Sequence, residues 1–124
     1  MDNKPPVPTE SEEQQALFQW AKLMQNMHPE LELMYHVPNG GKRHIGTARR
    51  LKAEGVKSGV PDVCLPVSRG EYHGLYIELK RTKGSTKSDN QEQWIEKLNT
   101  QGYCAILCYG WEDASRVILN YLKS

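Results

Sequence analysis

The sequence predicts an α/β fold with a central mixed β-sheet flanked by helices, and three observations lead to it. The chain has 124 residues, of which 38% are hydrophobic and 25% are charged, and this composition suits one globular domain. Helix-like and strand-like patterns alternate along the chain. The last strand-like segment is almost wholly apolar, as in a sheet covered on both faces. We expect a flexible, proline-rich tail over residues 1–8 and a single domain over residues 9–124.

Four segments have the signature of a helix. The first has capping residues at positions 9–11 and acidic residues in its first turn, where the helix dipole favours them. A short and very basic helix is expected over residues 45–54. The third begins at Ser88, which can form a capping box with Gln91. The last repeats apolar residues at helical steps over residues 114–122.

Pro29 ends the first helix, and the strands follow it in the sequence. The expected strands cover residues 31–37, 60–67, 75–80 and 103–109. The second and third of them are close enough in sequence to form a hairpin. The third and fourth are joined by the helix that begins at Ser88, so they form a strand–helix–strand crossover. The order of elements is therefore helix, strand, short helix, strand, strand, helix, strand, helix.

The charged residues are segregated along the chain, although the net charge is only +1. Residues 42–87 contain eleven Lys or Arg and four Asp or Glu, a local balance of +7, and the remainder has a balance of −6. A concentrated basic stripe is the electrostatic signature of a phosphate-binding surface. From charge alone, a solvated face without a partner is an equally open interpretation.

Several classes of protein are disfavoured by the sequence. The beginning of the chain has no apolar stretch of a secretory signal, and no segment is apolar enough to span a bilayer. We expect an intracellular, cytoplasmic protein without a membrane partner. The cysteines Cys64, Cys104 and Cys108 are odd in number and lie in apolar runs, so we expect buried free thiols rather than disulfides or a zinc site.

Two of the expected strands carry charged residues where a core pattern calls for apolar ones. Asp62 follows Pro61 at the start of one strand, and Glu78 and Lys80 lie on the next. Glu78 and Lys80 share a face because side chains alternate along a strand, and a hairpin brings Asp62 towards Glu78. Paired carboxylates repel unless a cation neutralises them, and their oxygens suit Mg²⁺ or Mn²⁺. The spacing alone is also explained by an ion pair between Glu78 and Lys80 on a solvated face and by an ordinary turn at Pro61-Asp62.

The motifs together resemble a known nuclease superfamily. They are Gly59-Val60-Pro61-Asp62, Tyr76-Ile77-Glu78-Leu79-Lys80, Ser88-Asp89-Asn90-Gln91, Ser11-Glu12-Glu13-Gln14, Val37-Pro38-Asn39-Gly40-Gly41 and Gly102-Tyr103. In this order they resemble the PD-(D/E)xK nucleases, and in particular the VRR-NUC (virus-type replication-repair nuclease) family, over about residues 9–122. The resemblance implies a restriction-endonuclease-like core and metal-dependent hydrolysis of DNA phosphodiesters.

The resemblance also implies roles for individual residues. Asp62 and Glu78 would bind Mg²⁺ or Mn²⁺ together with the carbonyl of Leu79, and Lys80 would be the catalytic lysine. Gln91 would reach the site from the start of its helix, where capping alone also explains it. A glutamate of the first helix would complete the acidic site. The family's order of residues favours Glu12, whereas the helical wheel favours Glu13, and charge compensation at the helix start explains either.

The DNA-binding surface is expected on basic and glycine-rich segments. The residues assigned to it are Asn39, Gly40, Gly41, Lys42, Arg43, Arg49, Arg50, Lys52, Lys83 and Lys87. The loop that begins at Asn39 can hold phosphate through its amides, or it can be a plain hairpin turn. The sequence shows no aromatic interleaving typical of single-strand stacking and no helix-turn-helix motif, which favours recognition of DNA shape.

The leading functional hypothesis is a structure-selective DNA endonuclease, encoded by a bacterium or phage. Branched or junction DNA is the favoured substrate, and a Holliday-junction resolvase is one form of this activity. Since a symmetric four-way junction needs two cuts, a homodimer is expected. The main alternative is a non-catalytic DNA-binding module of the same fold. A nucleotide-binding α/β protein is disfavoured because Gly40 and Gly41 match neither common phosphate-loop spacing.

Overall fold

The computed structural model describes residues 5–38 and 45–124. The helices are α1 (Glu10–Met24), α2 (Ile45–Ala53), α3 (Asp89–Thr100) and α4 (Trp111–Leu122), with a 3₁₀ helix, η1 (Pro29–Leu33), after α1. The strands are β1 (Tyr35–His36), β2 (Val63–Leu65), β3 (Leu75–Lys80) and β4 (Cys104–Tyr109). The order of elements is the one that the sequence predicts, with η1 added.

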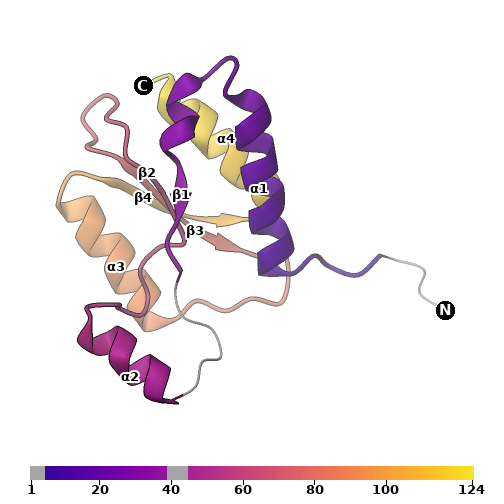
Figure 1. The fold of residues 1–124 in the computed structure, drawn as a ribbon. Helices are drawn as coiled ribbons and strands as arrows, with labels where there is room; N and C mark the ends of the chain where they lie inside the picture. The colour runs from indigo at the N-terminus through magenta and orange to yellow at the C-terminus, as the bar shows by residue number, and fades with distance from the viewer. Residues whose placement is uncertain (1–4, 39–44) are drawn as a thin grey trace.

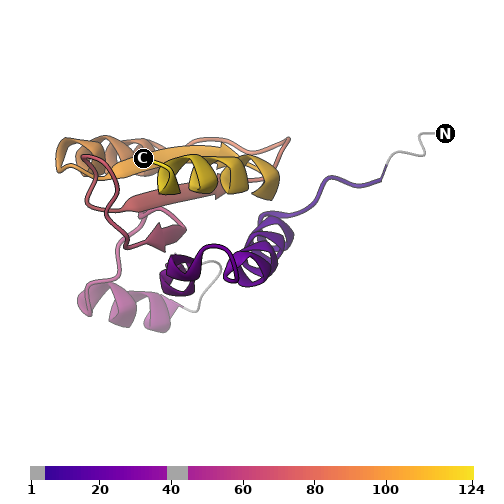
Figure 2. The same ribbon diagram turned by 90° about the horizontal axis from the view of Figure 1, so that it is seen from above.

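The described strands form one mixed sheet in the order β1-β2-β3-β4. β1, β2 and β3 are antiparallel neighbours, and β4 runs parallel to β3 after the crossover through α3. Figure 1 shows α1 and α4 on one side of this sheet and α3 on the other. In Figure 2, seen from above, α4 lies in front of β3 and β4. The predicted hairpin and crossover are therefore confirmed.

The apolar core lies between the sheet and the pair α1 and α4. Alternate residues of β3 point into it, and Ile77 and Leu79 are at most 2% exposed. They pack with Leu17 of α1 and with Ala114 and Ile118 of α4, all of them fully buried. The intervening residues of β3 must face the opposite side, because side chains alternate along a strand. This alternation puts Glu78 and Lys80 on the face that α3 partly covers.

The prediction of a strand over residues 31–37 is wrong for most of its length. A 3₁₀ helix occupies the first part, with Pro29 at its beginning, and only Tyr35 and His36 form strand. Leu31 and Met34 are buried while Leu33 is 53% exposed. A spacing of three between buried residues fits a 3₁₀ helix, whereas a strand would bury every second residue.

The strand predicted over residues 60–67 is reduced to its centre, Val63–Leu65. Pro61 and Pro66 flank this centre, and neither can donate a backbone hydrogen bond to the ladder. Residues 75–80 form β3 as predicted, and Ser88 makes the predicted capping box with Gln91.

The three cysteines are free thiols, as the sequence predicts. Cys64 and Cys108 are buried, whereas Cys104 is only half-buried. Within residues 5–38 and 45–124, no helix combines the length and apolarity that a membrane crossing requires.

Candidate active site

Asp62 and Glu78 lie opposite each other at the end of the β2–β3 ladder. The register pairs Val63 with Ile77, and one step further along it places Asp62 against Glu78 and Pro61 against Leu79. Pro61 has no N–H with which to bind the Leu79 carbonyl. The proline therefore ends the ladder at the point where the two carboxyl groups meet.

The Asp62 carboxylate contacts the backbone of β3 at this end of the ladder. Its Oδ2 accepts a hydrogen bond from the backbone N–H of Leu79 at 2.9 Å. The Asp62 carbonyl accepts from the backbone N–H of Val37 at 2.7 Å and from Nδ1 of His36 at 2.9 Å. These contacts hold both the backbone and the side chain of Asp62. In a strand, the C=O and N–H of one residue point to the same edge, so the Leu79 carbonyl is directed to the Asp62 side.

Glu78 is a buried carboxyl group, only 2% exposed. Its Oε1 accepts a hydrogen bond from Nε2 of Gln91 at 3.0 Å, while its buried Oε2 has no donor among the described residues. The pKa of Glu78 is raised to about 9, chiefly by burial; the Asp62 carboxyl group and Glu10 contribute in the same direction, and Lys80 acts in the opposite one. A buried carboxyl oxygen without a donor is a costly arrangement that a bound cation would relieve.

Gln91 performs two roles with one side chain. Its Oε1 accepts from the backbone N–H of Ser88 at 3.2 Å in the capping box, and its Nε2 donates to Glu78. The two interpretations that the sequence leaves open are therefore both realised in the structure. Gln91 therefore connects the start of α3 to the buried carboxyl group of Glu78 through hydrogen bonds.

Lys80 lies beside the carboxyl pair on the same face of β3. Its side chain is 8% exposed, and its Nζ is 3.9 Å from Oε1 of Glu10 in the first turn of α1. An ammonium group with so little contact with water must be compensated by nearby carboxylates. Glu10 is 51% exposed and so extends the acidic cluster towards solvent.

The two glutamates that the sequence singles out in α1 have other contacts. The Oε1 of Glu12 accepts from the backbone N–H of Thr9 at 2.9 Å, which completes the capping box of α1. Buried Glu13 accepts from the backbone N–H of Trp111 at 3.1 Å and so caps the start of α4. The acid of α1 that the structure brings to Lys80 is Glu10, which the sequence marks only as a first-turn acid.

A glycine fixes the approach of the Asp62 segment to α3. Gly59 has a φ of +87°, and a Cβ atom there would lie 2.8 Å from the backbone of Asn90. Any side chain would therefore be strained and would push α3 away. The side chain of Asn90 donates to Oγ of Ser58 at 3.0 Å and closes the same contact.

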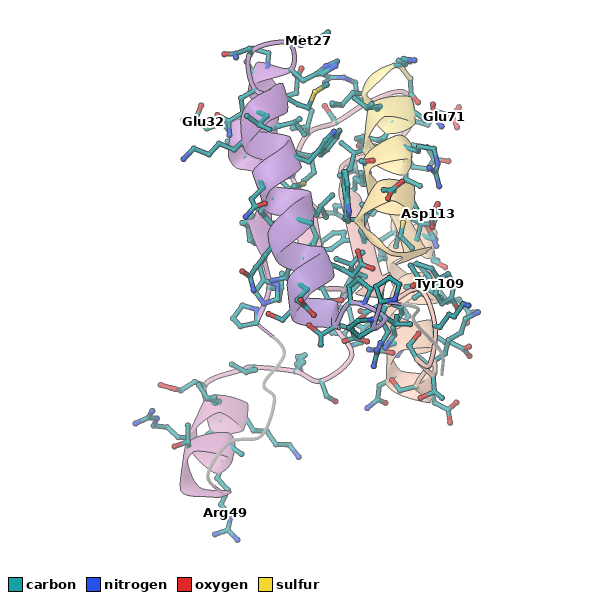
Figure 3. All side chains as sticks on the ribbon, turned by 90° about the vertical axis from the view of Figure 1, so that its right-hand side faces the viewer. Met27, Glu32, Arg49, Glu71, Tyr109 and Asp113 are labelled. Carbon is teal, nitrogen blue, oxygen red and sulfur yellow. The ribbon has the colours of Figure 1, made fainter. Side chains whose placement is uncertain are left out.

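The basic residues assigned to DNA lie on separate exposed segments. Arg49, Arg50 and Lys52 are exposed on α2, which has no buried side chain among those described. Figure 3 shows α2 standing away from the body of the molecule with Arg49 pointing outward. Lys83 and Lys87 are exposed on the loop between β3 and α3. The predicted site residues Asn39, Gly40, Gly41, Lys42 and Arg43 lie outside the described residues.

The donor set fits a hard divalent cation that keeps part of its water shell. Within the described ranges, no group of three or more His, Cys, Asp and Glu side chains is arranged as a metal cluster. The protein ligands on offer are the carboxylates of Asp62 and Glu78 and the carbonyl of Leu79. Mg²⁺ is commonly held by one or two carboxylates together with water and substrate phosphate.

Comparison with known proteins identifies the same family as the motifs. The family model of the VRR-NUC domain matches residues 8–112. A solved structure named "VRR_NUC domain protein" is 34% identical and superposes with a TM-score of 0.82, covering 95% of this chain and 91% of that one. A search of the curated proteins gives no match. The predicted resemblance and the restriction-endonuclease-like fold class are confirmed.

Proposed function

Because this chain belongs to the VRR-NUC family, we propose that it is a metal-dependent, structure-selective endonuclease that hydrolyses DNA phosphodiesters. The observation that carries the proposal is the buried Glu78 carboxyl group beside Asp62 and Lys80, with one oxygen that has no donor within residues 5–38 and 45–124. A purely structural role would favour an apolar residue or a fully satisfied polar one at this position.

Each side chain has a definite task in this proposal. Asp62, Glu78 and the Leu79 carbonyl would hold Mg²⁺ or Mn²⁺, which would supply Lewis acidity towards the phosphate and lower the pKa of water. Lys80 would orient the attacking water and stabilise the negative charge that develops on the phosphate. Gln91 holds the Glu78 carboxylate in place, and Glu10 holds the Lys80 ammonium group.

The substrate proposed is branched or junction DNA. The exposed basic side chains of α2 and of the loop before α3 are the proposed contacts to the phosphates around a cut. The described part of the chain offers one candidate site, whereas a symmetric four-way junction requires two cuts. We therefore propose a homodimer for junction resolution, and light scattering after gel filtration tests it.

The activity is tested with a labelled four-way junction, a flap and a linear duplex, each with Mg²⁺, Mn²⁺ or EDTA. We expect metal-dependent cutting that is strongest on branched DNA. Lys80→Ala and Asp62→Ala should abolish cutting while DNA binding persists, and Lys97→Ala on the exposed side of α3 is the charge-matched control.

Two results would contradict this proposal in different ways. Cutting that survives Lys80→Ala or Asp62→Ala would place the chemistry elsewhere in the molecule. Binding without cutting of any DNA, with either metal, would instead identify a DNA-binding module of nuclease fold.

A further inference from the structure

A row of side chains lies next to the acidic pair on the same face of the sheet. The register pairs Tyr35 of β1 with Cys64 of β2, and Cys64 with Tyr76 of β3. Cys64 and Tyr76 are each two residues along their strands from Asp62 and Glu78. The two rows therefore share a face and are separated by about 7 Å.

Further aromatic rings extend this row. The ring of Tyr103, from the connection between α3 and β4, meets Tyr76 edge-on at a centroid distance of 5.5 Å. The ring of His73 also contacts Tyr103, at a centroid distance of 5.6 Å. We call Tyr35, Tyr76, Tyr103 and His73 the aromatic strip.

The aromatic strip is accessible, and it is separate from the core. Tyr35 is 50% exposed, His73 is exposed, and Tyr76 and Tyr103 are half-buried. The strip contributes no residue to the apolar core, which lies on the opposite face of the sheet. Cys64, which is 4% exposed, lies between Tyr35 and Tyr76 in the register of the sheet.

We propose that the aromatic strip binds an unpaired nucleotide of the DNA substrate, adjacent to the phosphate that is cut. Aromatic side chains stack on any base whose face is free, and a base inside a continuous duplex offers no free face. The strip is continuous with the site of Asp62 and Glu78, and residues 42–87, which supply β2 and β3, carry a local balance of +7 that attracts the phosphates. The inference rests on the proposed nuclease function and specifies its substrate as DNA with an unpaired nucleotide at the cut.

The test measures binding in EDTA, so that cutting does not interfere. The probes are one duplex carrying either a short thymidine tail or a tail of abasic nucleotides, which has the same phosphates and no bases. We expect the full chain to bind the thymidine tail about 10-fold or more tightly than the abasic one. Tyr35→Ala should remove this difference, and Tyr35→Phe should keep it.

The control variant is Tyr72→Ala, which removes a similarly exposed tyrosine, 43% exposed, outside the aromatic strip. It should keep the preference for the thymidine tail. Equal affinity of the unaltered protein for the two tails would overturn the inference, and so would a preference that survives Tyr35→Ala. Cutting of any DNA with Mg²⁺ is measured separately, so a failure of the nuclease proposal is distinguished from a failure of the aromatic strip.

Discussion

Replacement of Glu78 by glutamine should stabilise the metal-free protein. The side chain keeps its shape, its oxygen still accepts from Gln91, and its new amide group donates towards Asp62. In the native protein the pKa of Glu78 rises from 4.5 to about 9, chiefly because the carboxyl group is buried. The folded state therefore keeps a proton that the unfolded state releases at neutral pH.

The size of the effect follows from this difference in proton binding. Below about pH 4.5 both states are protonated and the contribution of Glu78 to stability is fully present; it is lost as the pH rises towards about 9. At about pH 7.5 the pH lies about three units above the pKa of the carboxyl group in the unfolded state. At about 1.4 kcal/mol per unit, the protonation of Glu78 in the folded state then costs at most about 4 kcal/mol. We expect Glu78→Gln to raise the free energy of unfolding at this pH by about 1–4 kcal/mol.

The assay is urea unfolding of both proteins in EDTA across this pH range, repeated with Mg²⁺. The difference between variant and unaltered protein should grow as the pH rises. Mg²⁺ should stabilise the unaltered protein and have little effect on the variant, because one ligand has been removed. Glu71→Gln, at an exposed position, is the control. A Glu78→Gln protein that is less stable in EDTA, or that differs by a constant amount at every pH, would refute the reasoning.

Substitutions at three further places test other contacts. Gly59→Ala should cost about 2 kcal/mol or more in urea unfolding, because of the positive φ and the close backbone of Asn90; an unchanged midpoint would contradict this close contact. Glu13→Ala should lower the free energy of unfolding by about 1–3 kcal/mol and Glu13→Gln by less, since only the latter keeps an acceptor for the start of α4; equal losses would contradict capping. The double change of Arg49 and Arg50 to Gln should alter the free energy of unfolding by no more than about 0.5 kcal/mol. The slope of the logarithm of the DNA-binding constant against the logarithm of the salt concentration should become less steep by about one to two units. An unaltered slope would show that α2 does not contact the DNA.

Short-range patterns in the sequence were sufficient to predict many of the helices and strands. The capping box of Ser88 and Gln91 and the alternation along β3 are short-range patterns, and the structure realises both. The segment after Pro29 was misread because Leu31 and Leu33 alternate with polar residues as in a strand, whereas the structure buries Leu31 and Met34. Only the packing against α1 decides between these, since it determines which side chains are buried.

The sequence by itself determined which residues form the acidic pair. The Pro61-Asp62 and Glu78-Leu79-Lys80 motifs carry that information, because strand alternation and a hairpin are enough to place them on one face. The tertiary structure alone decided which acid of α1 reaches Lys80, since Glu10, Glu12 and Glu13 lie within one helical turn and the sequence does not show what packs against each of them. The tertiary structure also decided the aromatic strip. Tyr35, Tyr76 and Tyr103 are far apart in the sequence, and only the pairing of the strands with Cys64 and the packing of the Tyr103 ring on Tyr76 bring them together.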